Sequence, residues 1–219
     1  MIEKRQLHST DVLDIKSIAT DVYVLSFRRD FSFTAGQVIA IDVEPNGTPR
    51  LYSIASSEDD ENIEILFDEK PEGKLTPMLS KLKTGDKVYV SEPFGKFHCK
   101  EDKAWWIASG TGIAPFLSMA RSGMTSGKTL IHGARYDENF YFSELLERLM
   151  GESFIRCCSQ QENTQHYAGR LTQWIRAKDK LPSDTSFYLC GSPEMVVEVR
   201  DLLISKGVSF KNIISETYF

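Results

Sequence analysis

The sequence has few of the features that mark metal-binding, secreted or membrane-spanning proteins. Its four cysteines form no CxxC pair, which argues against a zinc site or an iron–sulfur cluster held by this chain alone. No apolar run approaches the roughly 20 residues needed to cross a bilayer. The polar start MIEKRQLHST lacks the pattern of a signal peptide. We therefore expect a cytoplasmic protein with no metal site and no membrane-inserted segment.

Charge of one sign is not concentrated anywhere along the 219 residues. The 26 lysines and arginines are scattered and the formal net charge is −5, so we expect no nucleic-acid partner. Hydrophobic residues make up 41% of the chain, which is enough for a packed core and excludes a disordered protein. The composition does not set an oligomeric state.

Up to about residue 97 the sequence predicts short strands and one helix. The strands are rich in β-branched and aromatic residues and are separated by turn residues. They are expected at residues 22–28, 37–43, 51–55, 62–67 and 87–91. Thr76 is expected to cap the helix, Pro77 to open it and Gly85 to close it. Short strands joined by such turns predict a small antiparallel β-barrel.

After about residue 98 strands and helices alternate along the chain. Strands are expected at residues 104–108, 128–134, 154–159, 186–190 and 211–215, and helices at 115–121, 144–149, 172–178 and 194–206. This alternation is typical of a parallel sheet with helices on both faces. The prediction is therefore a two-domain protein, with a β-barrel in residues 1–98 and an α/β domain in residues 99–219.

The segment SGTGIAP, Ser109 to Pro115, lies between an expected strand and the following helix. Gly110 and Gly112 allow a tight turn and a close approach of the backbone to a ligand, and the helix N-terminus attracts a pyrophosphate. The spacing departs from the dinucleotide fingerprint, because Pro115 stands where that fingerprint has Gly or Ala. An ordinary glycine-rich turn is the alternative.

Two segments of the first half combine groups suited to a phosphorylated aromatic ligand. In RLYS, Arg50 could pair with phosphate, Tyr52 could stack on a ring and Ser53 could donate a hydrogen bond. The loop from Gly73 to Thr76 runs into the expected helix and offers backbone N–H groups and a hydroxyl to an anion. An exposed strand and a plain capped helix are the respective alternatives.

Six segments stand in a distinctive order: RLYS (50–53), GKLTP (73–77), SGTGIAP (109–115), HGARY (132–136), CGSPEMV (190–196) and SETYF (215–219). In this order and spacing they resemble the ferredoxin–NADP reductase family over essentially the whole chain. FTAGQ (33–37) and LKTGDKV (82–88) are most similar to its bacterial flavodoxin and ferredoxin reductases. The resemblance implies an FAD-binding barrel followed by an NAD(P)-binding α/β domain.

The resemblance also implies roles for individual residues. It implies FAD contacts at Arg50, Leu51, Tyr52, Ser53, Leu66, Gly73, Lys74, Leu75, Thr76, Tyr218 and Phe219. It implies contacts at the nicotinamide dinucleotide site from Ser109, Gly110, Thr111, Gly112, Pro115, Ala134, Arg135, Ser159, Arg170, Gly191, Pro193 and Met195. Ser53, Cys190 and Glu216 would flank the reacting atoms and act in catalysis.

One departure from the family concerns the coenzyme. Close relatives carry an arginine for the 2′-phosphate of NADP after the serine that corresponds to Ser159, and this chain has Gln160 there. A charge-assisted hydrogen bond of about 1.5–3 kcal/mol is thereby lost. Because Arg135 and Arg170 match the other basic contacts, NADPH is the expected coenzyme, with NADH left open.

The function implied by the resemblance is hydride transfer from NADPH or NADH to FAD, followed by single-electron transfer to ferredoxin or flavodoxin. One alternative is the reductase component of an oxygenase system. A second is a regulatory module that binds a nucleotide without turnover, and a third is an enzyme that releases reduced flavin. Intact Ser53, Cys190 and Glu216 argue against the regulatory module.

Overall fold

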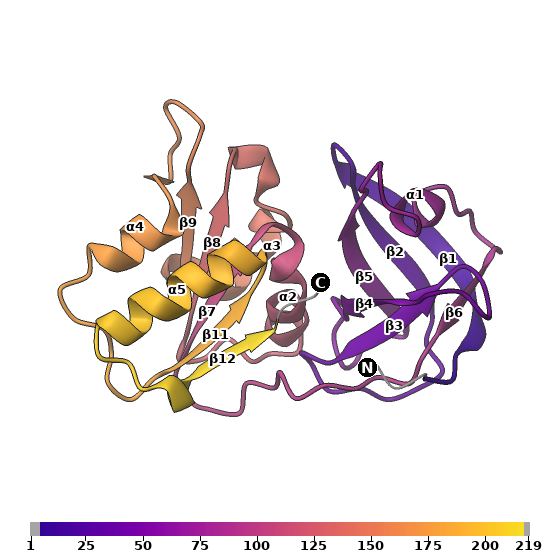
Figure 1. The fold of residues 1–219 in the computed structure, drawn as a ribbon, viewed down its shortest axis with the longest axis horizontal. Coiled ribbons are helices and arrows are strands. Elements are labelled where there is room, and N and C mark those ends of the chain that lie inside the picture. The colour runs from indigo at the N-terminus through magenta and orange to yellow at the C-terminus, as the bar shows by residue number, and fades with distance from the viewer. Residues whose placement is uncertain (1–4, 217–219) are drawn as a thin grey trace. The chain divides into compact units, whose positions relative to one another are not determined.

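The computed structural model describes residues 5–216, which divide into two compact units, one ending at His98 and the other beginning at Cys99 (Figure 1). Each unit is built around its own sheet. Among the described residues, no helix is both long enough and apolar enough to cross a membrane.

The first unit is a six-stranded antiparallel sheet in the order β4-β3-β6-β1-β2-β5. Its strands are β1 (His8–Ala19), β2 (Val22–Arg28), β3 (Val38–Asp42), β4 (Arg50–Ser53), β5 (Asn62–Asp68) and β6 (Lys87–Val90). Beyond β4, Ile54 forms a bridge with Ile65 of β5, and the Ala55 N–H donates to the Glu64 carbonyl over 2.8 Å. These contacts join the two edge strands, so the expected antiparallel barrel is confirmed.

The interior of the barrel is aliphatic and aromatic. Alternation along β2 and β5 turns Leu25, Phe27, Ile63, Ile65 and Phe67 inward, and all five are almost completely buried. Each such side chain stabilises the fold by about 1.5–3 kcal/mol through removal from water. The core thus supports β5 and the neighbouring end of β4.

The longest strand of the barrel, β1, was not predicted from the sequence. It pairs with β6 through His8–Asp11 and with β2 through Val12–Ala19, with irregular register near Val12 and Ser17. Most of its residues lie on the exposed or half-buried side, so its sequence HSTDVLDIKSIA is too polar to show a strand pattern.

The expected helix is much shorter than predicted. Helix α1 contains only Thr76–Leu79. The prediction of Thr76 as the N-cap is wrong, because Leu75 holds that position and Thr76 is the first helical residue. The prediction that Gly85 closes the helix is also wrong, since Gly85, with φ +91°, lies in the turn that leads into β6.

The second unit is a parallel sheet in the order β10-β9-β8-β7-β11-β12. Its strands are β7 (Ala104–Ser109), β8 (Lys128–Ala134), β9 (Phe154–Cys158), β10 (Tyr167–Ala168), β11 (Ser186–Cys190) and β12 (Ile213–Glu216). Its helices are α2 (Ala114–Arg121), α3 (Ser143–Met150), α4 (Leu171–Arg176) and α5 (Pro193–Ser205). The expected parallel α/β sheet is confirmed, and of its strands within the described residues only the two-residue β10 was not foreseen.

Helices cover both faces of this sheet (Figure 1). Trp105 and Trp106 are neighbours on β7 and therefore point to opposite faces. Trp105 contacts Trp174 of α4, with ring centroids 5.8 Å apart, whereas Trp106 stacks on Phe116 of α2 at 5.7 Å. Helix α5 shares a buried cluster with α4, so α4 and α5 cover one face and α2 covers the other.

The strand order places a switch point between β7 and β11. From β7 the chain builds β8, β9 and β10 on one side, and it then returns to build β11 and β12 on the other. In open parallel sheets of this kind, ligands bind beyond the carboxyl ends of the strands at the switch point. The fold therefore predicts a ligand site at the carboxyl ends of β7 and β11.

Candidate active site

The glycine-rich turn after β7 is shaped by contact with the end of β11. Residues Gly110–Ile113 form a 3-10 turn that runs directly into α2. A Cβ atom on Gly112 would lie 2.4 Å from the Cys190 carbonyl oxygen and 2.5 Å from the Gly191 Cα atom. Both atoms belong to the backbone and cannot move aside alone. Position 112 therefore requires glycine for this close approach.

The turn after β11 meets the same segment from the other side. Gly191 has a φ of +152°, and a Cβ atom there would lie 2.3 Å from the Ser109 Oγ atom. The Ser192 N–H donates to Ser109 Oγ over 3.2 Å. The structure thus brings together four of the predicted site residues, Ser109, Gly112, Cys190 and Gly191.

Two helices of the second unit begin at these turns. Pro115 lies in the first turn of α2, and Pro193 opens α5, where a missing N–H costs nothing. The Ser192 hydroxyl caps α5 by accepting a hydrogen bond from the Met195 N–H over 3.2 Å. The remaining N–H groups and the positive dipole ends favour an anion next to the switch point.

Cys190 is a buried thiol at the carboxyl end of β11. Burial, followed by the charge of Glu216, raises the pKa of Cys190 far above that of a free thiol. Parallel register pairs Cys190 with Ala108 of β7 on one side and with Glu216 of β12 on the other. At neutral pH the site therefore contains a protonated, polarisable sulfur beside a carboxyl group.

The carboxyl ends of β8 and β9 form a polar corner. The Ser159 N–H and hydroxyl both donate to the Ala134 carbonyl, at 3.0 and 3.1 Å. The Gln160 N–H donates to the Arg135 carbonyl over 2.9 Å. The side chains of Arg135, Gln160 and Arg170 are exposed. Backbone hydrogen bonds thus hold this corner, and its long side chains face solvent.

Asp137 adds a fixed negative charge to this corner. Its carboxylate accepts hydrogen bonds from Gln161 Nε2 over 2.9 Å and from the Thr164 hydroxyl over 2.7 Å. Desolvation opposes ionisation, but the hydrogen bonds from Thr164 and Cys158 prevail and lower the pKa of Asp137. A shallow pocket opens beside it, lined by Tyr136, Asp137, Glu138 and Gln161.

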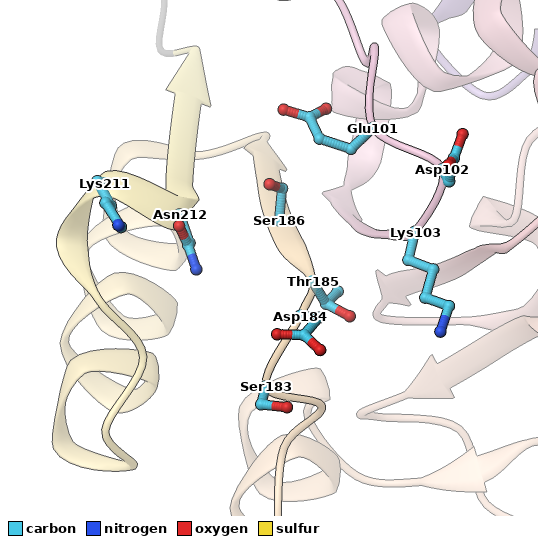
Figure 2. Close-up of a pocket in the computed structure, with 9 residues that line it drawn as sticks. All are labelled: Glu101, Asp102, Lys103, Ser183, Asp184, Thr185, Ser186, Lys211 and Asn212. Carbon is cyan, nitrogen blue, oxygen red and sulfur yellow. The ribbon is translucent and has the colours of Figure 1, made fainter.

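Another pocket of the second unit lies at the opposite ends of the strands. Figure 2 shows it lined by residues that precede or begin β7, β11 and β12: Glu101, Asp102, Lys103, Ser183, Asp184, Thr185, Ser186, Lys211 and Asn212. These residues lie at the amino ends of the strands. The pocket is therefore separate from the glycine-rich turns.

In the first unit the RLYS segment is β4, at the edge of the sheet. Arg50 is exposed, Tyr52 is half-buried and Ser53 is buried. The Tyr52 ring meets Phe67 edge-on, with centroids 6.2 Å apart, and burial raises its pKa so that the phenol stays neutral. The bridge that follows β4 brings this strand beside β5, where Leu66 is buried.

The loop before α1 is closed by two hydrogen bonds. The Gly73 N–H donates to the Lys70 carbonyl, and the Lys70 N–H donates to Thr76 Oγ1, each over 2.8 Å. The Thr76 hydroxyl still carries its own hydrogen and can donate to an anion. Lys74 is exposed, and Leu75 anchors the loop in the core. The geometry suits a phosphate at this loop.

Most of these residues were predicted from the sequence. His132, Asp137 and Ser192 were not among them. Ser192 had a detectable signal, since a serine directly before Pro193 is typical of a helix N-cap. Tyr218 and Phe219 lie outside the described residues, and the roles of all the predicted site residues remain predictions.

Comparison with known proteins defines the class. Residues 9–99 match the oxidoreductase FAD-binding domain, and residues 106–201 match the oxidoreductase NAD-binding domain. The chain is therefore an electron-transfer oxidoreductase with a flavin domain and a nicotinamide dinucleotide domain.

More specifically, the chain belongs to the ferredoxin/flavodoxin–NADP reductase family. It is 33% identical to the flavodoxin/ferredoxin–NADP reductase of Escherichia coli, over 75% of this chain and 76% of that protein. The ferredoxin NADP+ reductase of Neisseria gonorrhoeae, solved with bound FAD and NADP, shares the fold with a TM-score of 0.86 at 21% identity, covering 97% of this chain and 99% of that one.

Another relative belongs to an oxygenase system. The electron transfer component of toluate 1,2-dioxygenase from Pseudomonas putida is 30% identical over 98% of this chain. The chain spans 65% of the length of that relative.

Proposed function

We propose that this chain works in the cytoplasm as a reductase that takes hydride from a reduced nicotinamide dinucleotide onto FAD and passes electrons singly to ferredoxin or flavodoxin. The observation that carries the proposal is the contact of the glycine-rich turn after β7 with Cys190 and Gly191 at the switch point of the parallel sheet. In the first unit, the polar and aromatic side chains around β4 support the proposal.

The residues of the first unit fit FAD. Tyr52 offers a half-buried neutral ring, and Ser53 a hydroxyl at the end of the same strand. Exposed Arg50 and the loop from Gly73 to Thr76 would hold the phosphates through a cation, backbone N–H groups and a hydroxyl. When bound, FAD accepts a hydride as an electron pair and releases electrons one at a time.

The residues of the second unit would bind and orient the coenzyme. The turn at Gly110–Ile113 and the start of α2 would face the pyrophosphate. Cys190, held protonated by its buried position, would pack against the nicotinamide without adding a charge. Glu216 would lie beside Cys190 on the neighbouring strand β12. These residues position the reacting ring and exclude water, which is the part of catalysis that the protein supplies.

The proposal is tested with the purified protein under anaerobic conditions. A yellow protein that retains stoichiometric FAD and bleaches on addition of NADPH or NADH is the expected result. A colourless protein that does not take up FAD would indicate the nucleotide-binding regulatory module instead. Release of the flavin on reduction would indicate an enzyme that supplies free reduced flavin.

The electron acceptor is the second part of the proposal. The relatives include proteins named flavodoxin/ferredoxin–NADP reductase and proteins named dioxygenase electron transfer component, so service to an oxygenase is the alternative. Reoxidation of the reduced protein by ferredoxin, by flavodoxin and by an oxygenase component should be compared at equal concentration. Faster reoxidation by the oxygenase component would favour the alternative.

Coenzyme choice is expected to depend on Gln160. The substitution Gln160→Arg should raise the kcat/KM ratio of NADPH to NADH by about 10-fold or more, because a guanidinium can form a charge-assisted bond with a 2′-phosphate worth about 1.5–3 kcal/mol. The measurement is flavin reduction with both coenzymes. Gln165→Arg is the matched control, since Gln165 is also exposed on the loop that follows β9. Equal shifts in the two variants would show a general effect of charge.

A further inference from the structure

A fully buried histidine lies beneath the glycine-rich turn. His132 is on β8, in register with Ala108 of β7, and none of its surface is exposed. Its ring meets Phe140 edge-on, with centroids 5.4 Å apart. Its Nε2 atom lies 3.2 Å from the Gly110 carbonyl oxygen. The His132 side chain thus connects β8 to Gly110, the first residue of the turn.

The surroundings of His132 decide which nitrogen carries the proton. Burial lowers the pKa of His132 to about 4, so the ring is neutral at physiological pH. A carbonyl oxygen only accepts hydrogen bonds, so the hydrogen must be on Nε2 and the Nε2–H donates to Gly110. Within residues 5–216, Nδ1 is buried without a hydrogen-bond partner. Among the described residues, the hydrogen bond from Nε2 to the Gly110 carbonyl is therefore the polar contact of the His132 ring.

This hydrogen bond orients a peptide group of the turn. In a trans peptide the C=O of one residue and the N–H of the next point in opposite directions, and the described chain contains no cis peptide. Because the Gly110 carbonyl points inward to His132, the Thr111 N–H points away from it. The first N–H groups of such a turn have no partner within the turn, so among the residues that the structure describes the Thr111 N–H is left available to a ligand.

Side-chain packing around the Gly110 Cα does not account for this orientation. Gly110 has a φ of +54°, and a Cβ atom placed on it would meet no atom of residues 5–216 within 4 Å. A glycine in open space adopts several backbone conformations at similar cost. The hydrogen bond from His132 adds to the i→i+3 hydrogen bonding of the 3-10 turn in favouring the observed orientation over a flipped peptide.

We propose that His132 is a positioning residue that holds the Gly110–Thr111 peptide so that the Thr111 N–H faces the pyrophosphate of the dinucleotide. The inference rests on the proposed function, because it assigns the turn to dinucleotide binding. His132 touches neither coenzyme nor flavin in this role, and it acts through the backbone of the turn.

The test compares two substitutions of the same residue in the FAD-loaded protein. His132→Phe keeps a flat ring for packing against Phe140 but removes the donor, and His132→Gln places an amide N–H near the position of Nε2. His132→Phe is expected to raise the Kd for NADP+ and NAD+ about 10-fold, the effect of losing one hydrogen bond, with the limiting rate of flavin reduction changed much less. His132→Gln is expected to restore most of the affinity.

A control separates positioning from loss of stability. Leu130 is also buried on β8, on the same face as His132, and Leu130→Val removes one methylene without touching the turn. This variant should lower Tm but leave the Kd for the dinucleotide unchanged. A Kd in His132→Phe equal to that of the unaltered protein, or an equal rise in Leu130→Val, would overturn the proposal.

A second measurement needs no variant. Nitrogen-15 NMR of the histidines in the intact protein should show His132 as the neutral tautomer with hydrogen on Nε2 across pH 6 to 8. A charged ring, or hydrogen on Nδ1, would overturn the proposal. If the unaltered protein were reduced by neither coenzyme, the proposed function would fail, whereas normal reduction with an unaffected His132→Phe variant would reject only the role of His132.

Discussion

Replacement of Gly112 by alanine is expected to abolish rapid flavin reduction by NADPH or NADH while leaving FAD bound. The added Cβ atom would lie 2.4 Å from the Cys190 carbonyl oxygen and 2.5 Å from the Gly191 Cα atom. Neither backbone atom can yield alone, so the two turns must separate. A displacement of about 1 Å between reacting groups lowers the rate by roughly 100-fold, which anaerobic stopped-flow absorbance would detect.

The control for this prediction is Gly207→Ala. Gly207 has a left-handed backbone, with φ +87°, and a Cβ atom there would meet no atom of residues 5–216 within 4 Å. This variant carries backbone strain of about 1 kcal/mol or more without a clash at the turns. It should lose stability and keep its rate of flavin reduction. A Gly112→Ala variant that reduces its flavin at the rate of the unaltered protein would contradict the proposed packing of the two turns.

The second large effect is expected at Ser53. Ser53→Ala should slow hydride transfer by about 10- to 100-fold, as expected for the loss of a hydrogen bond of about 1.5–3 kcal/mol to charge that develops during the reaction. The affinity for FAD should fall much less, because Arg50, Tyr52 and the Gly73–Thr76 loop would remain. Rates per bound flavin and FAD titrations on the same preparation measure the two effects separately.

Ser56→Ala is the matched control for Ser53→Ala. Ser56 is fully buried three residues further along, where its hydroxyl accepts a hydrogen bond from the Glu64 N–H over 3.2 Å. Its loss should lower Tm without changing the rate per bound flavin. Loss of flavin from Ser53→Ala with an unchanged rate per bound flavin would show that Ser53 only anchors FAD.

Much of the fold was predictable because many strands and helices carry a local signal. The β-branched and aromatic runs that became β2, β5 and β8 predicted strands near their observed bounds. Strand β1 escaped because it is polar along most of its length and is stabilised by pairing with two partners. The apolar spacing around Leu75 and Leu82 suggested a longer helix than α1, yet regular helix ends at Leu79 and Ser80 follows as the C-cap.

The site was predictable in its residue types but not in its contacts. SGTGIAP indicated a phosphate turn from local sequence, and RLYS indicated a ring and an anion site. The reason that Gly112 must be glycine lies in Cys190 and Gly191, which are distant in sequence and meet it through the pairing of β7 with β11. The contact of His132 with Gly110 likewise depends on the register between β7 and β8, which a single sequence does not show.

The central claim is hydride transfer from a nicotinamide to FAD bound by this chain. Its most direct test is anaerobic stopped-flow reduction with NADPH and NADH, each also prepared with deuterium at the transferred position. The account predicts loss of flavin absorbance with at least one coenzyme and a slower reduction with the deuterated form. A protein that retains FAD but is reduced by neither coenzyme would contradict it.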